Sequence, residues 1–315
     1  MNNREKMDKN FISSVVYLNT ADSADSLRVF LEKLLKNMSE KWAKYELILV
    51  DDDTSGELLD VAKAAKKLDK EASITILHMS SYQGMEMSMN AGRDLAIGDF
   101  VFEFDECTYN FTEDQIVKVY EECLKDNDIV SCADESKSNN LSNAFYKIYN
   151  RFAETEYKLG SDNFRILSRR GINRIQSLNR AIPYRKAMYA NCGLKYAKLS
   201  YSPVSAADYS HDKRENRARR NLAVDSLLLF TGVGYKITLG LSAIMAAVMI
   251  FSAIYAMVMY IGGIAIAGWT TTMLFLSFAF FGLFVILSVV IKYLSLLVNL
   301  NFKKQRYMFE GVEKL

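Results

Sequence analysis

One uninterrupted apolar segment constrains this chain more than any other feature. From Ile237 to Ile291 the sequence contains no Asp, Glu, Lys or Arg. Two stretches within it, Ile237–Ile261 and Trp269–Ile291, each exceed 20 residues, which is enough to cross roughly 30 Å of hydrocarbon at about 1.5 Å per helical residue. The sequence IGGIAIAG between them is too short to be a domain. The segment therefore predicts a hairpin of two transmembrane helices.

Basic residues flank both ends of this segment, and Asn216–Tyr235 mixes charged, apolar and small residues as an interfacial amphipathic helix does. By the positive-inside rule, the N-terminal region and the C-terminal tail both face the cytoplasm, and the chain belongs in the cell (inner) membrane. We expect a cytoplasmic domain at 1–210, a basic juxtamembrane segment at 211–236, two spans at 237–300 and a cytoplasmic basic tail at 301–315. The basic residues are Lys213, Arg214, Arg217, Arg219 and Arg220 before the spans, and Lys303, Lys304 and Arg306 after them.

Bulk composition excludes several classes of protein. A formal net charge of +2 does not suggest a nucleic-acid binder. The 4 cysteines have neither metal-ligand spacing nor the density of a disulfide scaffold, so reduced thiols are expected. The polar N-terminus MNNREKMDKN lacks the apolar core of a signal peptide, so we expect the first domain to stay in the cytoplasm.

Strands and helices alternate through the first hundred residues. Because the strands are almost continuously apolar, the pattern predicts an α/β fold with a mostly parallel sheet covered by helices on both faces. The predicted strands are Phe11–Leu18, Tyr45–Val50, Ser73–His78 and Phe100–Phe104, and the predicted helices are Ser26–Met38, Gly56–Leu68 and Gly84–Ala96.

Three further segments follow this core. Ser136–Asn143 is polar and is interpreted as a mobile loop that could act as a lid. Phe145–Tyr157 has aromatic residues at helical spacing, and Phe164–Leu178 is typical of a short strand that leads into a helix.

Acidic residues fall just beyond two of the predicted strands, at Asp51–Asp53 and at Asp105–Glu106. In open α/β sheets ligands bind at this carboxyl edge. Strand alternation places Glu103 on the same side as Asp105, whereas Glu106 faces away unless the chain turns. The alternative interpretation of both acidic groups is a solvated turn, which at Asp51–Asp53 would be stabilised by the dipole of the next helix.

The segments LILVDDDTS, SYQGMEMSMNAGRDLAIGDFVFEFDE and FRILSRRGINRI, followed by a two-helix hairpin and a tail containing KKQRY, resemble the family 2 glycosyltransferases. The resemblance is to the branch of dolichol-phosphate mannose synthase and the bacterial polyprenyl-phosphate glycosyltransferases, and it spans nearly the whole chain. It implies a GT-A-like fold in which the sheet binds a nucleotide sugar.

The resemblance also implies roles for individual residues. Asp51 and Asp52 match the acidic pair that binds the nucleotide, and Gly84 matches the start of the helix packed beneath it. Asp105 and Glu106 match the Asp-x-Asp motif, whose carboxylates hold Mg²⁺ or Mn²⁺ at the donor diphosphate. The second Asp of that motif is Cys107 here, and a thiol is a poor ligand for a hard cation.

Basic residues complete the implied site. Arg165 and Arg169 match groups near the diphosphate and the acceptor phosphate, and Arg170 adjoins them. Arg185 could likewise meet an anion. Arginine suits phosphate because its planar group donates paired hydrogen bonds and stays charged. The alternative is a basic helix start on the surface for Arg170 and a structural role for Arg185. Asp105 and Arg165 are the expected catalytic residues.

The implied reaction transfers a sugar from a nucleotide diphosphate sugar to a polyprenyl (undecaprenyl or dolichyl) phosphate for surface glycan synthesis. The expected partners are these two substrates and the membrane, without nucleic acid, and self-association is left open. Two alternatives remain: a transferase with another glycan acceptor, and a non-catalytic, membrane-tethered protein that binds nucleotide sugars.

Overall fold

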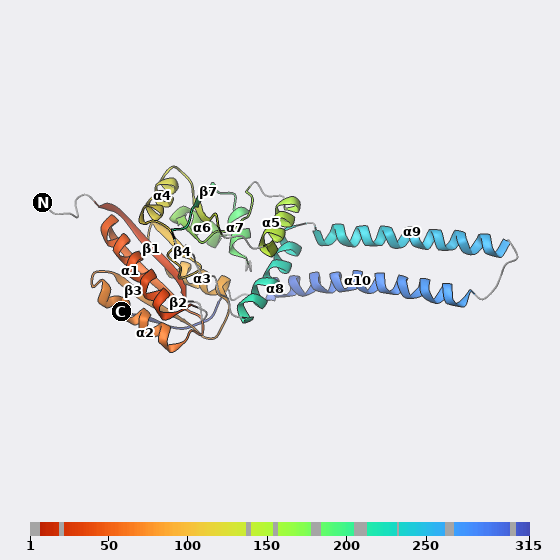
Figure 1. Ribbon diagram of the computed structural model, residues 1–315, viewed down its shortest axis with the longest axis horizontal. Helices are drawn as coiled ribbons and strands as arrows, with labels where there is room; N and C mark the ends of the chain where they lie inside the picture. Colours follow the sequence, from red (N-terminus) through yellow and green to blue (C-terminus); the bar gives the residue numbers. More distant parts are fainter. Residues whose placement is uncertain are drawn as a thin grey trace. The chain divides into compact units, whose positions relative to one another are not determined.

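The computed structural model describes residues 7–18, 22–136, 140–153, 157–177, 184–204, 213–231, 233–261, 268–302 and 307–315. The chain divides into two compact units (Figure 1). The first unit comprises Met1–Arg151, Thr155–Ala223 and Lys303–Leu315, and the second comprises Phe152–Glu154 and Val224–Phe302. The predictions for Lys303, Lys304 and Arg306, and for most of the link IGGIAIAG, lie outside the described residues.

The first unit is built on an eight-stranded sheet, counted over the described residues, with the strand order β7-β5-β6-β4-β1-β2-β3-β8. Neighbouring strands pair in parallel except where β6 meets β4 and β5 and where β8 meets β3. The predicted mostly parallel sheet is therefore confirmed. The strands are β1 (Asp8–Leu18), β2 (Trp42–Asp51), β3 (Ser73–Met79), β4 (Phe100–Phe104), β5 (Ile129–Asp134), β6 (Phe164–Ser168), β7 (Tyr196–Tyr201) and β8 (Phe309–Lys314).

Helices cover both faces of this sheet because its strands alternate apolar side chains to each side. Ile12 and Val16 of β1 pack with α1 (Ala24–Lys41), α2 (Gly56–Leu68) and α4 (Glu113–Leu124). Val15 and Tyr17 pack on the other face with α3 (Met85–Leu95), α6 (Arg169–Ser177) and α7 (Arg185–Ala190). The α/β domain therefore has two hydrophobic cores, one on each face of the sheet.

Helix α3 approaches the sheet closely through Gly92. A Cβ atom at this position would lie 2.5 Å from a methyl carbon of Val15 and 2.6 Å from one of Val50. Only a glycine therefore allows the helix to pack at this depth, which is the role expected for the small residues of this helix. The contact holds α3 closely against β1 and β2.

The predicted elements of the first hundred residues are confirmed with small shifts in their ends, and the strand and helix of Phe164–Leu178 appear as β6 and α6. The loop prediction for Ser136–Asn143 is too long, since helix α5 (Asn140–Phe152) begins at Asn140. Residues 137–139 lie outside the described residues. Elements that were not predicted are α4, β5, α7, β7 and β8.

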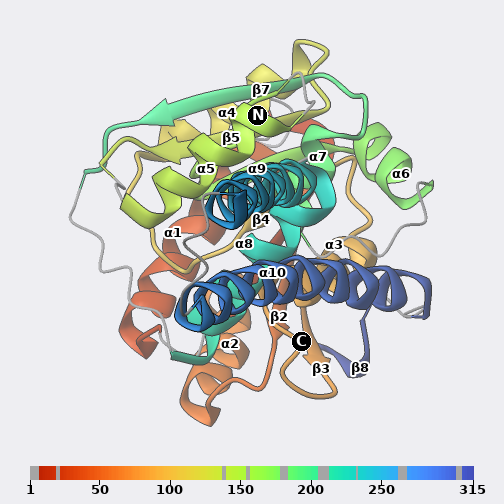
Figure 2. The ribbon, with the colours of Figure 1, turned by 90° about the vertical axis from the view of Figure 1, so that its right-hand side faces the viewer.

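Strand β8 lies beside β3 at the edge of the sheet, although it follows the long helices in the sequence (Figure 2). Its register pairs His78 with Gly311 and Leu77 with Val312. Residues 301–315 were expected to form a basic tail. The structure shows instead that their last part is an edge strand of the α/β domain.

The second unit is dominated by helices α9 (Val233–Ile261) and α10 (Trp269–Phe302), which follow α8 (Lys213–Phe230). Gly282 of α10 packs against Met245 of α9. Large apolar side chains of both helices are exposed, among them Phe251 at 72% and Phe281 at 65%. A search of the described residues for a helix long and apolar enough to cross a membrane finds none.

Candidate functional site

The carboxyl ends of β2, β3 and β4 gather acidic side chains at one edge of the sheet. Asp51, the last residue of β2, is buried. One of its carboxylate oxygens accepts the N–H of Thr54 at 2.9 Å, and the other lies 2.7 Å from Nδ1 of His78 on β3. His78 also lies 3.3 Å from Glu313 of β8. Asp51 is therefore held in a fixed orientation at the edge where α/β sheets bind ligands.

Asp52 joins the end of β2 to the start of α3. Its carboxylate accepts the N–H groups of Gln83 at 2.7 Å and Gly84 at 2.8 Å, and the hydroxyl of Tyr17 at 3.1 Å. Gly84 has a φ of 86°, a conformation that glycine adopts without steric cost. Burial raises the pKa of Asp52 although the two N–H donors act in the opposite direction. The structure thus gives Asp52 and Gly84 a common role in anchoring α3.

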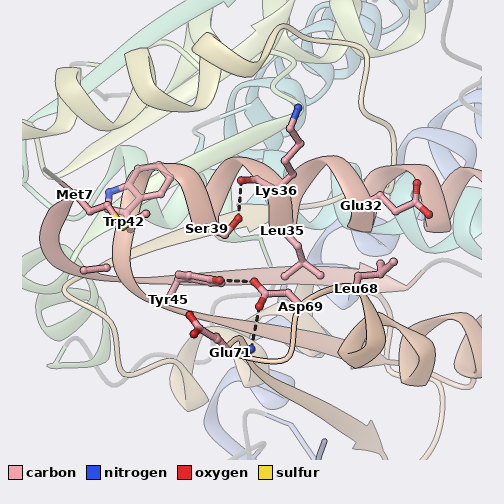
Figure 3. A pocket seen from close by; sticks show the side chains of 11 residues that line it. Met7, Glu32, Leu35, Lys36, Ser39, Trp42, Tyr45, Leu68, Asp69 and Glu71 are labelled. Atoms are coloured by element: carbon pink, nitrogen blue, oxygen red, sulfur yellow. Dashed lines mark hydrogen bonds between the residues drawn. The ribbon is translucent and has the colours of Figure 1, made fainter. Parts of the chain in front are cut away.

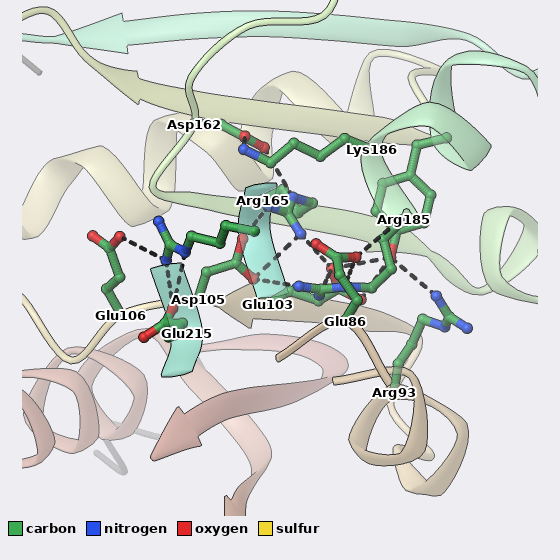
Figure 4. A network of polar contacts seen from close by, with 12 residues as sticks. Glu86, Arg93, Glu103, Asp105, Glu106, Asp162, Arg165, Arg185, Lys186 and Glu215 are labelled. Atoms are coloured by element: carbon green, nitrogen blue, oxygen red, sulfur yellow. Dashed lines mark hydrogen bonds and ion pairs between the residues drawn. The ribbon is translucent and has the colours of Figure 1, made fainter. Parts of the chain in front are cut away.

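Asp105 lies in a group of charged residues that have almost no solvent exposure (Figure 4). Arg165 of β6 donates to Asp105 at 2.5 Å and to Glu103 at 2.8 Å. Arg185 of α7 donates to the same two carboxylates at 2.7 Å and 2.9 Å. The prediction that Glu103 and Asp105 point to the same side of β4 is confirmed. We call the whole group the buried ion cluster; its members are Glu86, Glu103, Asp105, Asp162, Arg165, Arg185 and Lys186.

The outer members of the buried ion cluster tie further segments to the sheet. Glu86 of α3 accepts both the backbone N–H and the guanidinium of Arg185. Asp162, just before β6, accepts Nε of Arg165 at 2.9 Å and pairs with Lys186 of α7. The cluster therefore connects α3, β4, β6 and α7, which come from widely separated parts of the sequence.

Charge pairing keeps these groups ionised although they are buried. Burial alone would raise the pKa of Asp105, but the positive charges of Arg165 and Arg185 outweigh it and hold that pKa well below its usual range. The pKa of Asp162 is lowered in the same way by Arg165 and Lys186. Burial would lower the pKa of Arg185, but Asp105 and Glu86 raise it well above the usual value. Charge pairing thus favours the ionised forms of Asp105, Asp162 and Arg185.

The three residues that match the metal-binding motif point in different directions. Asp105 faces the buried ion cluster. Glu106 lies 3.7 Å from Arg219 of α8, which also pairs with Glu215 at 2.7 Å. The thiol of Cys107 is buried, its Sγ lies 3.3 Å from the carbonyl oxygen of Tyr17, and burial raises its pKa well above the usual value. The expected ligand pair of Asp105 and Glu106 does not converge on one point.

These residues do not fit a divalent cation in the arrangement observed. Both oxygens of Asp105 already accept hydrogen bonds from guanidinium groups. Two unit charges 4 Å apart interact by about 4 kcal/mol at an effective dielectric of 20, so a divalent ion there would meet about twice that repulsion from each arginine. Within the described residues, no three His, Cys, Asp or Glu side chains are grouped to hold a metal ion.

Arg169 and Arg170 lie away from Asp51 and Asp105. Since β6 runs antiparallel to β4, its last residue pairs with Phe100 at the opposite end of the sheet. Arg169 donates to the carbonyl oxygens of Ala96 and Gly98 there, and Arg170 donates to Asp128 at 2.6 Å and 2.8 Å. The predicted grouping of Arg169 with the diphosphate site therefore does not occur, because the direction of β6 could not be determined from its sequence.

Several residues of the buried ion cluster were not identified from the sequence. Glu86 and Asp162 are single acidic residues in polar stretches, and nothing in their spacing marks them. Tyr189, whose hydroxyl contacts Glu103 at 2.8 Å and Arg93 at 3.0 Å, belongs to a short helix that was also missed. The one signal in the sequence is the presence of two charged residues, Glu86 and Arg93, on the face of α3 that is otherwise buried.

A pocket of about 430 Å³ opens elsewhere, between the end of α1, the start of β2 and the end of α2 (Figure 3). Its lining includes Lys36, Trp42, Tyr45 and Asp69, and the hydroxyl of Tyr45 donates to Asp69. Because it includes the first residues of β2, the pocket lies at the amino end of the parallel strands. It is therefore distinct from the edge that carries Asp51 and Asp105.

The fold and the acidic carboxyl edge together define an α/β protein with a polar candidate binding site at the carboxyl ends of its strands. Comparison with known families identifies its family: residues 15–185 match Glycosyl transferase family 2. The match covers more than half of the chain, so this protein belongs to that family.

Individual similar proteins are distant. An uncharacterized glycosyltransferase of Synechocystis sp. is 24% identical over 177 residues, which are 54% of this chain and 55% of the relative. The chain thus spans about half the length of this relative. A mannosyltransferase of Pyrobaculum calidifontis, solved with GDP-Man and Mn²⁺, has a TM-score of 0.48 at 12% identity, covering 95% of this chain and 89% of that one. Mannosyl-3-phosphoglycerate synthase of Rubrobacter xylanophilus has a TM-score of 0.48 at 13% identity, with 69% and 74% covered.

Proposed function

We propose that this glycosyltransferase moves a sugar from a nucleoside diphosphate sugar to a polyprenyl phosphate at the cytoplasmic face of the cell membrane. The observation that supports a nucleotide-sugar donor is the environment of Asp51. Asp51 is a charged carboxylate, fixed by Thr54 and His78, at the carboxyl edge of a sheet within the family match. A carboxylate in that place can accept hydrogen bonds from the ribose or the base of a nucleotide.

The second unit supports a lipid acceptor. Helices α9 and α10 expose apolar side chains along their length, and no charged residue occurs between Ile237 and Ile291. Helices that are apolar on all sides are stable only where something apolar surrounds them. A bilayer meets that condition, and it also holds the long-chain acceptor. The basic residues of α8, including the exposed Arg217 and Arg220, suit the anionic headgroups of the cytoplasmic leaflet.

The proposed reaction needs little proton transfer. A phosphate monoester has a second pKa of about 6, so the acceptor oxygen is anionic near neutral pH. It attacks the anomeric carbon of the donor, the bond from that carbon to the diphosphate oxygen breaks, and the nucleoside diphosphate leaves. The protein's contribution is to orient the donor through Asp51 and to hold the site rigid through the buried ion cluster.

The topology gives the first test. Tags at the two chain ends are expected to be digested by protease added to the cytoplasmic side of sealed, oriented membrane vesicles, because basic residues flank both ends of the apolar segment. A tag engineered between α9 and α10 should be protected and serves as the control. Protection of the C-terminal tag alone would contradict the proposed hairpin.

The donor site gives the second test. In detergent-solubilised protein, Asp51→Asn is expected to weaken binding of UDP-glucose or GDP-mannose, whichever the wild type binds, about tenfold or more, since a hydrogen bond to a charged group contributes roughly 1.5–3 kcal/mol. The matched control is Asp60→Asn, at an exposed position on helix α2. Titration calorimetry should show that this control variant changes the Kd for the nucleotide sugar by less than about twofold. Equal effects of the two substitutions would remove Asp51 from the donor site.

The acceptor is identified by product analysis. Membranes that contain the full chain are incubated with nucleotide sugars and polyprenyl phosphates, and the lipid product is analysed by mass. A glycosylated polyprenyl phosphate supports the proposal. Transfer to another glycan alone would favour the first alternative, and donor binding without any transfer would favour a non-catalytic binding protein.

A further inference from the structure

The residues that match the metal-binding motif in this chain include only one carboxylate that faces the interior of the site, that of Asp105. The residue two positions after Asp105 is Cys107, whose thiol is 1% exposed and lies against the carbonyl oxygen of Tyr17. A thiol is a soft ligand and a poor one for a hard cation such as Mg²⁺, and this thiol is directed at a carbonyl oxygen inside the fold. Glu106, between them, lies near Arg219 of α8. Of the residues that match the motif, only Asp105 therefore offers a carboxylate at this position.

That carboxylate is already neutralised from within the fold. Arg165 and Arg185, which are 1% and 0% exposed, each donate to both Asp105 and Glu103. The buried ion cluster contains four carboxylates and three cations, and Arg93 approaches it through the hydroxyl of Tyr189. Arg93 also pairs with Asp94 at 3.3 Å. The guanidinium groups therefore supply, at Asp105, the positive charge that a cation would otherwise bring.

Two arginines of α8 lie at the same edge, and each is paired with an acidic residue in this structure: Arg214 with Asp53, and Arg219 with Glu215. Arg214, 59% exposed, lies 3.3 Å from Asp53 beside the end of β2, and its guanidinium lies 4.0 Å from the ring centre of Tyr82. Arg219, 34% exposed, lies 3.7 Å from Glu106 beside the end of β4. The first turns of α8 thus present two arginines over the ends of β2 and β4, between which a diphosphate at this edge would lie.

We propose that this chain binds the diphosphate of its donor through Arg214 and Arg219 and needs no divalent cation, because Arg165 and Arg185 already occupy the electrostatic place of the metal at Asp105. The inference rests on the proposed nucleotide-sugar donor. Guanidinium groups suit this task because they bind phosphate oxygens in pairs and keep their charge at any physiological pH. Arg214 and Arg219 bind the ligand, while Arg165 and Arg185 pair with Glu103 and Asp105.

The test measures binding of UDP and GDP to the detergent-solubilised full chain by titration calorimetry, in EDTA and in millimolar Mg²⁺ or Mn²⁺. We expect the Kd of the preferred nucleotide to change less than about threefold between these conditions. Arg214→Met and Arg219→Met should each weaken binding about tenfold in EDTA. Arg28→Met, which changes an exposed arginine on α1, should alter the Kd less than about twofold.

Direct detection of the cation completes the experiment. Electron paramagnetic resonance of Mn²⁺ titrated into the wild type with UDP or GDP should show free Mn²⁺ and no protein-dependent bound signal. A tenfold or greater tightening of nucleotide binding by Mn²⁺, together with a bound signal, would overturn metal independence but leave the donor proposal intact. Absence of nucleotide binding in all conditions would instead defeat the proposed function itself. Equal effects of all three arginine substitutions would refute the assignment of the diphosphate to Arg214 and Arg219.

Discussion

Replacement of Arg185 by methionine is expected to destabilise the α/β domain by about 3–5 kcal/mol, which corresponds to a fall in Tm on the order of 10 °C. The side chain is 0% exposed and pairs with Glu86, Glu103 and Asp105. Methionine fills much of the same volume but leaves these carboxylates buried with too little positive charge. Thermal unfolding of the detergent-solubilised chain, followed by circular dichroism, measures the change.

The matched control is Arg28→Met. Arg28 and its partner Asp25 are 3.8 Å apart and largely exposed, so the loss is expected to stay within about 0.5 kcal/mol. A small effect of Arg185→Met, similar to that of Arg28→Met, would show that the buried ion cluster does not hold the domain together.

The difference in stability between the wild type and Arg185→Met depends on pH in a definite direction. The pKa of Asp105 is lower in the folded state than its unfolded value of about 3.9. The stability that Asp105 contributes is therefore present above about pH 4 and is lost as the pH falls below it. The difference in the free energy of unfolding between the wild type and Arg185→Met should be largest near neutral pH and should decrease in acid.

Replacement of residues 224–302 by a flexible linker is expected to leave a folded, nucleotide-binding domain that no longer glycosylates a lipid acceptor efficiently. A linker of about 20 Gly and Ser residues has an r.m.s. span of roughly 25 Å. The α/β domain keeps its own two cores and β8, whereas the second unit is removed. Because the linker variant is no longer held at the membrane that contains the acceptor, its rate of transfer to polyprenyl phosphate in vesicles should fall about 100-fold or more.

The companion variant ends at residue 232 and lacks β8 as well. It should be less stable than the linker variant, because β3 then loses its antiparallel partner. Binding of UDP or GDP reports on folding, and radiolabelled sugar recovered in the lipid phase reports on transfer. Undiminished transfer by the linker variant would contradict the role proposed for α9 and α10.

Sequence reasoning was most successful where periodicity was long and uniform. The strand and helix ranges up to Phe104 were predicted closely because each strand is a continuous apolar run and each helix has one apolar face. Beyond Phe104 the short strands β5 and β7 were missed. Each has 6 residues, and β7 is only partly buried, so its sequence YAKLSY carries little of that signal.

The site was predictable only in part for a different reason. The position of Asp51 and Asp105 at one edge follows from the direction of parallel strands, which the alternation of elements implies. The partners of Asp105 do not follow, because Arg165 and Arg185 are 60 and 80 residues away and meet it only through the antiparallel placement of β6 and the turn into α7. The sequence around Arg165 and Arg185 does not show that their charges are neutralised inside the fold.

The pairing of β8 with β3 affects the order in which the protein can be completed during its synthesis. Strand β3 ends at Met79, whereas its outer neighbour begins at Phe309, after both long helices have been made. At about 5–20 residues per second, a ribosome needs roughly 10–50 s to cover that interval. During this time the N–H and C=O groups along one side of β3 have no strand partner, and such an edge readily pairs with other chains. A chain released before residue 309 is made therefore exposes an unpaired edge of β3 that can associate with other chains.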